Sequence, residues 1–306
     1  MDRPLRIGTR GSPLALAQAN LVAGALRAVH GLDEAAVEIV AIRTSGDRIQ
    51  DRPLADLGGK ALWTRELDRA LLEEETDLSV HSMKDVESVR PETLRLAGML
   101  PRADVRDRLI GYGSVDDLPP GARVGTSSPR RAAQILRLRP DARIVPIRGN
   151  VATRLAKLRA GECDATLLAA AGLDRLGHGE IGAPVPVTVM LPAAAQGAIG
   201  IEVRAGDERT AAMAAAVAHG ATGGAVGAER AFLAALGGNC HTPAAVLAER
   251  DGDRLRLRAQ ILSGDGAACE QIDERLAPDD RDAPARLAAE LLARAAPEVR
   301  RHFAGA

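Results

Sequence analysis

One short pattern occurs twice in this chain of 306 residues, and it limits the possible folds more than any other feature. Its first copy is LRIGTRGSP at 5–13, which reads as a short strand, a Gly-Thr pair and a Ser-Pro helix start. The second copy is RVGTSSP at 123–129, with one residue fewer before the Ser-Pro. Serine is a favoured N-cap and proline suits the first helical position. The repetition predicts an internal duplication, with two similar α/β lobes whose helix N-termini face a shared cleft.

Each predicted lobe contains a further apolar strand, DLSV at 77–80 in the first and DATLL at 164–168 in the second. The first of these strands runs into His81-Ser82-Met83-Lys84-Asp85 and so brings a hydroxyl, an ammonium and a carboxylate to its carboxyl end. Ligands of open α/β sheets bind at that end. A lysine beside an aspartate is also compatible with an exposed, weakly coupled pair on a turn. Residues 191–202 end as a strand and are predicted to return the chain to the first lobe.

The second lobe has arginines at strand ends and in first helical turns: Arg130, Arg131, Arg148 and Arg154. A cation at a helix N-terminus opposes the helix dipole, so these positions are unfavourable unless an anion binds there. Arginine pairs bidentately with carboxylate or phosphate. The pattern favours a local anion site, and the alternative is a set of solvated arginines. A glycine pair followed by Lys60 is a weak phosphate-loop signal without the full P-loop spacing.

Bulk composition limits the partners. The formal net charge of −1 argues against a protein that coats nucleic acid or an acidic membrane by bulk electrostatics. The N-terminus has no apolar signal region and no run reaches membrane-spanning length, so the chain is expected to be cytoplasmic. Three cysteines without close spacing fit a reducing compartment and predict neither disulfides nor a metal site.

The C-terminal part has a different character. An alanine-rich helix at 225–236 leads into a glycine-rich loop, GGNCHTP at 237–243. A strictly alternating strand at 255–261 and a helix at 284–296 follow, which predicts a small α+β domain. Cys240 lies in the loop and not in an apolar run, so it is either an accessible, reactive thiol or an ordinary loop cysteine.

Several unrelated motifs, in order along essentially the whole chain, resemble those of the porphobilinogen deaminase (hydroxymethylbilane synthase) family: TRGSPLAL at 9–16, GGK at 58–60, VHSMKD at 80–85, GTSSPRR at 125–131, RGNV at 148–151, TRL at 153–155 and the Cys240 loop. This resemblance implies a transferase of tetrapyrrole biosynthesis. Members join four porphobilinogen molecules head to tail, with loss of ammonia, on a covalent dipyrromethane cofactor and then release hydroxymethylbilane by hydrolysis.

The resemblance also implies an α/β fold with two periplasmic-binding-protein-like lobes plus a small α+β C-terminal domain. The expected domains are 1–100 with 197–217, then 101–196, then 220–306 carrying the cofactor cysteine. A monomer that binds neither nucleic acid nor membrane is expected. The alternative function is a two-lobed cytosolic small-anion binding or sensor protein, which would leave Cys240 and the third domain without a role.

Each pyrrole carries an acetate and a propionate, so the growing chain is a polyanion. By the resemblance, Asp85 is catalytic, since a carboxylate stabilises the cation left by ammonia loss and can move protons. Cys240 holds the cofactor through a thioether. The other implied cofactor-binding residues are Lys84, Asp85, Thr126, Ser128, Arg130 and Arg131. The implied substrate-binding residues are Arg10, Ser12, Lys60, Arg148, Arg154 and Arg175, and no metal is implied.

The chain departs from the family pattern at four places. Trp63 stands where phenylalanine is more usual, Asp56 where some members carry lysine, and Pro129 where leucine is frequent. Glu87-Ser88 replaces the proline expected after Asp85-Val86. Every charged catalytic candidate is present, so the departures are interpreted as peripheral.

Overall fold

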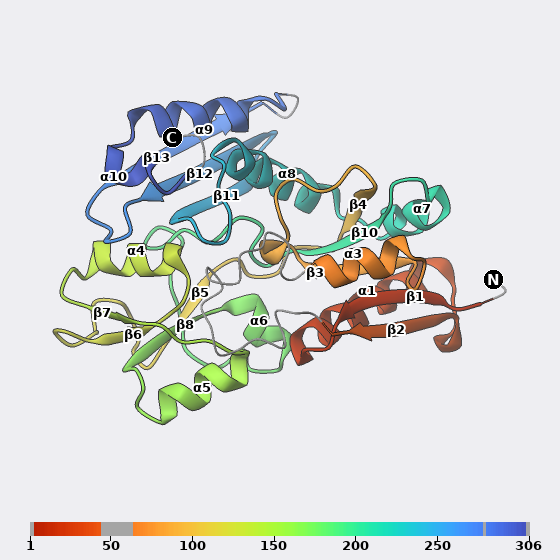
Figure 1. The fold of residues 1–306 in the computed structure, drawn as a ribbon, viewed down its shortest axis with the longest axis horizontal. Helices are drawn as coiled ribbons and strands as arrows, with labels where there is room; N and C mark the ends of the chain where they lie inside the picture. Colours follow the sequence, from red (N-terminus) through yellow and green to blue (C-terminus); the bar gives the residue numbers. More distant parts are fainter. Residues whose placement is uncertain (1–2, 44–63, 278–279, 304–306) are drawn as a thin grey trace. The chain divides into compact units, whose positions relative to one another are not determined.

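The computed structural model describes residues 3–43, 64–277 and 280–303 (Figure 1). They form two compact units, residues 1–103 with 197–223 and residues 104–196 with 224–306. The chain therefore leaves the first unit once, returns to it for one segment and leaves it again. The sequence predicts three domains, and this division into two units does not separate the second from the third, so the three-domain boundaries stay a prediction.

The first unit contains a five-stranded sheet with the order β2-β1-β3-β10-β4. Its strands are β1 (Leu5–Arg10), β2 (Val37–Ile42), β3 (Leu78–Ser82), β4 (Leu94–Met99) and β10 (Ile199–Arg204). The first three are parallel, whereas β10 runs antiparallel between β3 and β4. This confirms that the segment ending near residue 202 returns to the first sheet.

Helices cover this sheet. They are α1 (Pro13–His30), α3 (Arg65–Leu72) and α7 (Glu208–Ala216), with the short 3-10 helices η1 (Glu34–Ala36) and η3 (Met83–Asp85) in the connections. Helices α1 and α7 contact each other and share one aliphatic core with the strands, which includes Ile7, Leu26 and Ile201. Helix α3 packs against β1 and β3 (Figure 1).

The second unit repeats this sheet with the order β7-β6-β8-β5-β9. Its strands are β5 (Asp107–Ile110), β6 (Arg123–Gly125), β7 (Arg143–Val145), β8 (Ala165–Ala169) and β9 (Ala183–Pro184). Again three strands are parallel, and the fourth in order, β5, is antiparallel to its neighbours. The helices are α4 (Pro129–Leu138), α5 (Val151–Arg159) and α6 (Ala170–Arg175). The predicted duplication is confirmed strand by strand.

The Ser-Pro helix starts have the same capping bonds in both lobes. The Ser12 hydroxyl accepts the Ala15 N–H at 3.3 Å, and the Ser128 hydroxyl accepts the Arg131 N–H at 3.4 Å. Each proline occupies the first turn, where its missing N–H costs no hydrogen bond. The repeated motif therefore predicted both helix starts.

The acidic residue before the third parallel strand is also used alike in both lobes. The Asp77 carboxylate accepts the Arg6 N–H at 2.8 Å, and the Asp164 carboxylate accepts the Arg123 N–H at 2.8 Å. Burial alone would raise the pKa of Asp77, but the Arg3 guanidinium and the Arg6 N–H lower it to about 2. These bonds hold the first parallel strand of each lobe beside the third, β1 beside β3 and β6 beside β8.

Close packing explains the glycine of each Gly-Thr pair. A Cβ on Gly8 would lie 3.0 Å from Thr76, and one on Gly125 would lie 2.7 Å from both Cys163 and Ile147. Thr76 and Cys163 each immediately precede the acidic residue of their lobe. A larger residue would force the third parallel strand away from the first.

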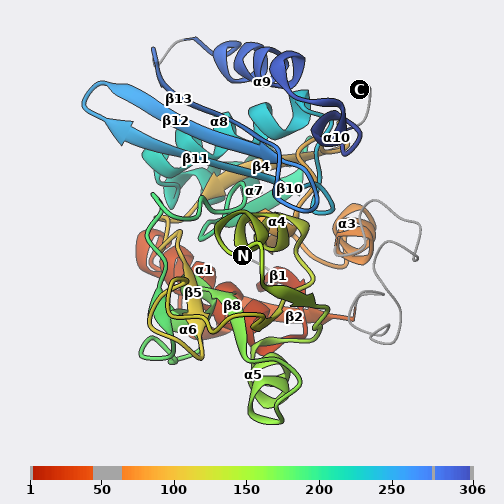
Figure 2. The same cartoon turned by 90° about the vertical axis from the view of Figure 1, so that its left-hand side faces the viewer.

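The C-terminal part is a three-stranded antiparallel sheet of β11 (Ala244–Asp251), β12 (Arg254–Leu262) and β13 (Cys269–Leu276). Helices α8 (Gly220–Ala235), α9 (Ala283–Arg294) and α10 (Pro297–Arg300) complete it, and α9 lies along β13 (Figure 2). Leu257, Ala259 and Ile261 alternate into the core together with Phe232 of α8. The predicted fold class, two α/β lobes and a small α+β part, is confirmed.

Candidate active site

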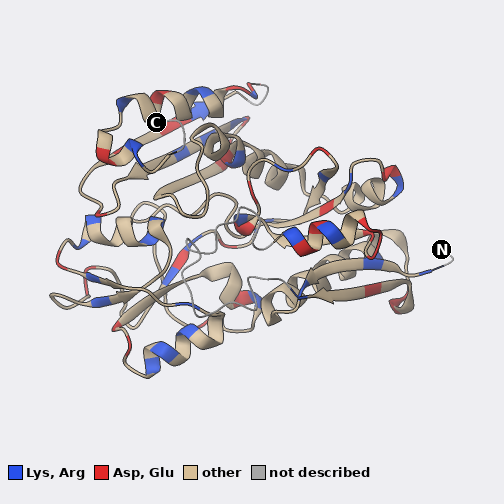
Figure 3. Ribbon diagram, in the orientation of Figure 1, with Lys and Arg blue, Asp and Glu red and all other residues tan. Residues whose placement is uncertain are grey.

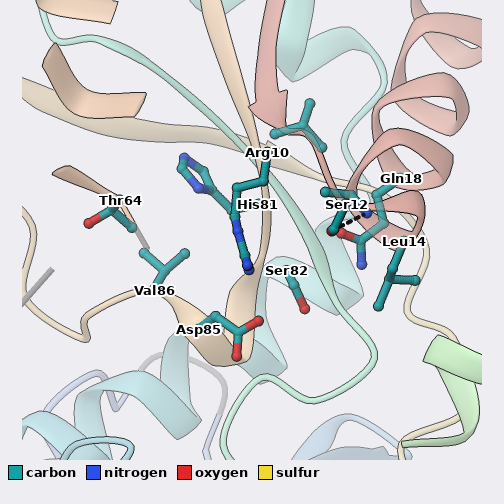
Figure 4. A pocket seen from close by; sticks show the side chains of 11 residues that line it. Arg10, Ser12, Leu14, Gln18, Thr64, His81, Ser82, Asp85 and Val86 are labelled. Carbon is teal, nitrogen blue, oxygen red and sulfur yellow. Dashed lines mark hydrogen bonds between the residues drawn. The ribbon is translucent and has the colours of Figure 1, made fainter. Parts of the chain in front are cut away.

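A pocket opens in the first unit where its parallel strands end (Figure 4). Strand β1, helix α1, strand β3 and the residues around η3 all contribute to its lining. The lining residues are Arg10, Ser12, Leu14, Ala15, Gln18, Thr64, Val80, His81, Ser82, Asp85 and Val86. The structure thus brings together three site residues that the sequence predicted, Arg10, Ser12 and Asp85.

The parallel pairing of β1 with β3 explains why these residues meet. Since Ile7 pairs with Leu78, the carboxyl ends of both strands reach the same edge of the sheet. Helix α1 starts at that edge and directs its N-terminal N–H groups and positive dipole end there. The Met83 N–H donates to Ala198 O at 3.1 Å and fixes the start of η3 beside β10. The edge is suited to an anionic ligand.

Asp85 differs from the other acidic residues near this edge. Its side chain is half-buried, lines the pocket and has no hydrogen bond within the described residues. Asp77 and Glu202, by contrast, are held by basic partners. In Figure 4 the Asp85 carboxylate points into the same space as the Arg10 side chain. Asp85 is therefore available to a ligand that carries positive charge or N–H groups.

Two buried polar residues of the pocket lining, Gln18 and His81, were not predicted as site residues. Gln18 is buried in the second turn of α1, and its side-chain nitrogen has no hydrogen-bond partner in the part of the chain that the structure describes. His81 is buried and its Nε2 lies 3.2 Å from the fully buried Glu202 carboxylate on β10. His81 lies within the motif at 80–85 and Gln18 two residues beyond the motif at 9–16, but neither residue type gave a signal of its own.

In the second unit, the predicted residues follow strands β6, β7 and β8, whose carboxyl ends share one edge because they are parallel. Thr126 is buried at the end of β6, and its hydroxyl accepts the Ser128 N–H at 3.1 Å. Asn150 caps α5 by accepting the Thr153 N–H at 2.9 Å. Gly149, with φ of 111°, leaves no room for a Cβ beside Thr153.

Arg130 and Arg131 form a buried cluster with an acid that was not predicted from the sequence. Their side chains are 4% and 7% exposed, and they donate to the two carboxylate oxygens of Asp107 at 2.9 Å and 2.7 Å. Gln196 adds a third donor to Asp107 at 2.9 Å. Burial alone would raise the pKa of Asp107, but the two guanidinium charges hold it well below its usual range. Asp107 thus orients both arginines.

The other predicted site arginines of the second unit, Arg148, Arg154 and Arg175, are half-buried. Arg148 lies in the turn after β7, Arg154 in the first turns of α5, and Arg175 at the end of α6. The Nε of Arg154 donates to Gly149 O at 2.9 Å, and burial lowers the pKa of Arg175. Basic residues continue along α5 (Figure 3). Arg148 and Arg154 thus lie after β7, at the carboxyl end of the sheet, where the sequence predicted them, and their role in binding a ligand stays a prediction.

Cys240 lies in the loop between α8 and β11. The loop is fixed by Asn239 and Thr242, since the Thr242 hydroxyl donates to Asn239 O at 2.7 Å and accepts the Asn239 N–H at 3.1 Å. Of the three cysteines, all within the described residues, Cys240 is the exposed one. Burial raises the pKa of Cys163 and of Cys269. Cys240 is the thiol best placed to react.

Lys84 is half-buried on η3, next to Asp85. Lys60, Trp63 and Asp56 lie outside the described residues. Within residues 3–43, 64–277 and 280–303, no cluster of three or more His, Cys, Asp and Glu side chains is arranged to hold a metal ion. No helix in the same ranges is long and apolar enough to cross a membrane.

Two family models match the chain. The model described as "Porphobilinogen deaminase, dipyromethane cofactor binding domain" matches residues 5–212, and "Porphobilinogen deaminase, C-terminal domain" matches residues 224–293. A porphobilinogen deaminase of Sphingopyxis alaskensis is 58% identical over 309 residues, which covers 99% of this chain and 98% of that protein. Another, from Paracoccus denitrificans, is 54% identical over 270 residues, or 87% of this chain and 86% of the relative.

Solved structures show a weaker likeness. The second substrate binding domain of a putative amino acid ABC transporter from Streptococcus pneumoniae matches with a TM-score of 0.44 and 14% identity, over 70% of this chain and 90% of its own. A TRAP periplasmic solute binding protein from Desulfovibrio salexigens matches with a TM-score of 0.42 and 11% identity, over 71% of this chain and 73% of its own. The sequence matches, and not these, identify the chain.

Proposed function

The chain belongs to the porphobilinogen deaminase family, and from this premise we propose which of its residues carry out the reaction. The reaction joins four porphobilinogen molecules head to tail with loss of ammonia and then releases hydroxymethylbilane by hydrolysis. It uses a dipyrromethane cofactor as primer. The enzyme is a transferase, and the small-anion sensor is not favoured because the family match extends through the C-terminal part.

Asp85 is proposed as the catalytic residue, and one observation carries this assignment. Its carboxylate lines the pocket with Arg10 and Ser12 and has no hydrogen bond within the described residues. Loss of ammonia from porphobilinogen leaves a positively charged pyrrole with an acidic N–H. A nearby carboxylate stabilises that charge and can accept or return a proton. The paired carboxylates of Asp77 and Glu202 are less suited to this role.

Features of the second unit fit the dipyrromethane cofactor. Cys240 is an exposed thiol and would hold the cofactor as a thioether. Arg130 Nε and Arg131 Nε are buried donors without a hydrogen-bond partner among the described residues, so a ligand carboxylate would satisfy them. Lys84, Thr126 and Ser128 are the further residues proposed to bind its acetate and propionate groups. When bound, the cofactor supplies a free pyrrole carbon to which substrate is added.

Substrate carboxylates are assigned to Arg10, Ser12, Lys60, Arg148, Arg154 and Arg175. These residues differ in the groups that surround them. Arg10 and Ser12 add a cation and a hydroxyl beside the dipole of α1, which favours one carboxylate. Arg148 and Arg154 combine guanidinium groups with the N-terminus of α5. Arginine is suited to these positions because its planar fork binds a carboxylate through two parallel hydrogen bonds.

Arg148→Ala is expected to raise the KM for porphobilinogen about tenfold or more, because a charge-assisted bidentate contact is worth about 1.5–3 kcal/mol. Steady-state porphobilinogen consumption measures it. Arg148→Lys should lie between wild type and alanine, since lysine keeps the charge but not the fork. Arg159→Ala is the matched control, an exposed arginine at the end of α5, the helix that follows Arg148. Wild-type KM in Arg148→Ala would refute the assignment.

A cytoplasmic location and a monomeric state are further proposals. The absence of a membrane-spanning helix among the described residues and the near-neutral formal charge of −1 are compatible with them. The monomer rests on the family resemblance alone, and light scattering of the purified protein tests it.

A further inference from the structure

Arg90 has an arrangement that the proposed reaction chemistry does not use. Its side chain is 8% exposed although it belongs to the irregular segment between η3 and β4. All three of its side-chain nitrogens donate hydrogen bonds. Nε and Nη2 donate to the two carboxylate oxygens of Glu202 at 2.8 Å and 2.9 Å, and Nη2 also donates to Asp68 at 2.5 Å. Nη1 donates to Glu87 at 2.8 Å and to Thr64 at 3.3 Å.

These partners connect the segment after Asp85 to the rest of the lobe. Glu202 lies on β10, which pairs with β3, and Asp68 lies on α3. Glu87 lies two residues after Asp85, and its carboxylate also accepts the Thr64 hydroxyl at 3.1 Å. Arg90 thus fastens the chain on the C-terminal side of η3 to the sheet and to α3. On the N-terminal side, the Met83 N–H already bonds to Ala198 O.

The cluster is strongly charged and largely buried, with Arg90 8% and Glu202 0% exposed. Burial alone would raise the pKa of Glu202, but His81 and Arg90 lower it to about 2. Burial raises the pKa of Asp68 despite the opposing effect of Arg90. Arg90 is therefore a cation that compensates the buried Glu202 carboxylate and the partly buried Asp68 carboxylate, and its position is specified by both. Removing one partner of such a buried ion pair is strongly unfavourable, because it leaves an uncompensated buried charge.

The same cluster forms one wall of the pocket. Thr64, His81 and Val86 all line it, and the first two contact Glu87, Arg90 or Glu202 directly. A shift of Arg90 would therefore move the wall and the short helix η3 together. A displacement of about 1 Å at a reacting group can lower a rate about a hundredfold.

We propose that Arg90 is a positioning residue for the reaction: it fixes η3, and with it the Asp85 carboxylate, by holding the following segment against Glu202 and Asp68. The proposal rests on the proposed role of Asp85. It assigns a role to Glu87 as well, whose carboxylate stands where the family pattern has proline. The pair Glu87–Arg90 supplies through side chains a local rigidity of the kind that proline supplies through its ring.

Arg90→Lys in the cofactor-loaded enzyme tests the proposal. Lysine keeps the charge that compensates the buried carboxylates, but its three donors cannot replace the five of arginine. We expect kcat to fall about 10- to 100-fold while KM stays within about threefold. The reason is that the substitution displaces the Asp85 carboxylate but leaves the groups that bind the substrate in place. Hydrogen exchange of the peptide containing residues 83–90 should accelerate. That readout is independent of turnover.

Arg204→Lys is the matched control. Arg204 lies on β10 like Glu202, pairs with Asp207 at 2.8 Å and donates to two backbone carbonyls, but it does not line the pocket. Its substitution should leave kcat and the exchange of residues 83–90 unchanged. Equal losses in both variants would show a general weakening of the lobe and overturn the proposal. So would an Arg90→Lys enzyme with wild-type kcat or with a change confined to KM.

Glu87→Gln is a second variant in case Arg90→Lys does not fold. It removes the charge of a partner that is 27% exposed and leaves the Glu202 and Asp68 contacts intact. We expect the same effects as in Arg90→Lys, but smaller ones. The kcat should fall about threefold or more, and hydrogen exchange of residues 83–90 should be faster. An unchanged kcat and unchanged exchange would overturn the proposal. If the Asp85 assignment alone were wrong, the exchange would still accelerate in both variants, which separates the two failures.

Discussion

Asp85→Asn is expected to lower kcat for porphobilinogen consumption by about 10²- to 10⁴-fold. The amide has the same shape as the carboxylate but carries no charge for the pyrrole cation and cannot accept a proton. Since the described residues make no hydrogen bond to the Asp85 carboxylate, the substitution breaks no internal contact among them. Thermal unfolding should therefore keep its wild-type midpoint, and KM should change little.

Glu92→Gln provides the matched control for this measurement. Glu92 is an exposed carboxylate in the same connection between η3 and β4, and it lies outside the pocket lining. Its substitution should leave kcat within about twofold of wild type, as is usual for a surface change. An Asp85→Asn enzyme with kcat close to wild type would remove Asp85 from the chemistry. A large fall in both variants would point to the connection and not to the carboxylate.

Asp107→Ala is expected to reduce the free energy of unfolding by about 3–5 kcal/mol, the cost of leaving buried charges without their partner. Arg130 and Arg131 both point at this carboxylate, which is 2% exposed, so removing it leaves two adjacent guanidinium groups in a dry environment. Urea denaturation followed by circular dichroism measures the change. Asp107→Asn should lie between wild type and the alanine variant, because its amide oxygen still accepts one hydrogen bond.

The control for Asp107 is Asp141→Ala in the same unit. Asp141 pairs with Arg139 at 2.9 Å, but its side chain is 43% exposed, so water solvates the arginine that remains. Asp141→Ala should therefore reduce the free energy of unfolding by only a small fraction of the reduction expected for Asp107→Ala. Equal losses of unfolding free energy in the two variants would mean that burial of the Arg130–Asp107–Arg131 cluster does not increase its contribution to stability.

The duplicated lobe was predictable because local rules act on it directly. A serine before a proline caps a helix regardless of its surroundings, and both predicted caps are present. The strands leading to Asp85 and to Arg148 needed only apolar runs and turn residues. Cys240 was recognised as a loop cysteine because glycines surround it, and its exposure agrees with that.

The strands that close each sheet were harder to predict. Strand β5 has only four residues, beginning Asp107-Arg108, and its charged start reads as a loop. Strand β13 also lacked a clear pattern, because half of its residues are exposed and its sequence, CEQIDERL, is mainly polar. Their strand character depends on pairing with distant partners.

The buried charge clusters were missed for a related reason. Arg130 and Arg131 were expected to be either solvated or reserved for a ligand, whereas Asp107 engages both. Asp107 is separated from Arg130 by 23 residues, and Glu202 from Arg90 by 112. The local sequence does not identify the acidic partner of a buried arginine, because many aspartates and glutamates elsewhere in the chain could pair with it. The resemblance to the family predicts which residues bind the ligand, but it does not predict which side chains hold them in place.

The intact mass of the purified, denatured protein tests the covalent attachment of the cofactor most directly, with Cys240→Ser measured beside it. We expect an added mass equal to two linked pyrrole units in the wild type and none in the variant. Cys163→Ser and Cys269→Ser should retain the addition, since both thiols are at least partly buried. A wild-type protein that stays unmodified even after incubation with porphobilinogen, or a Cys240→Ser protein that still carries the added mass, would contradict the role of Cys240 and with it the proposed mechanism.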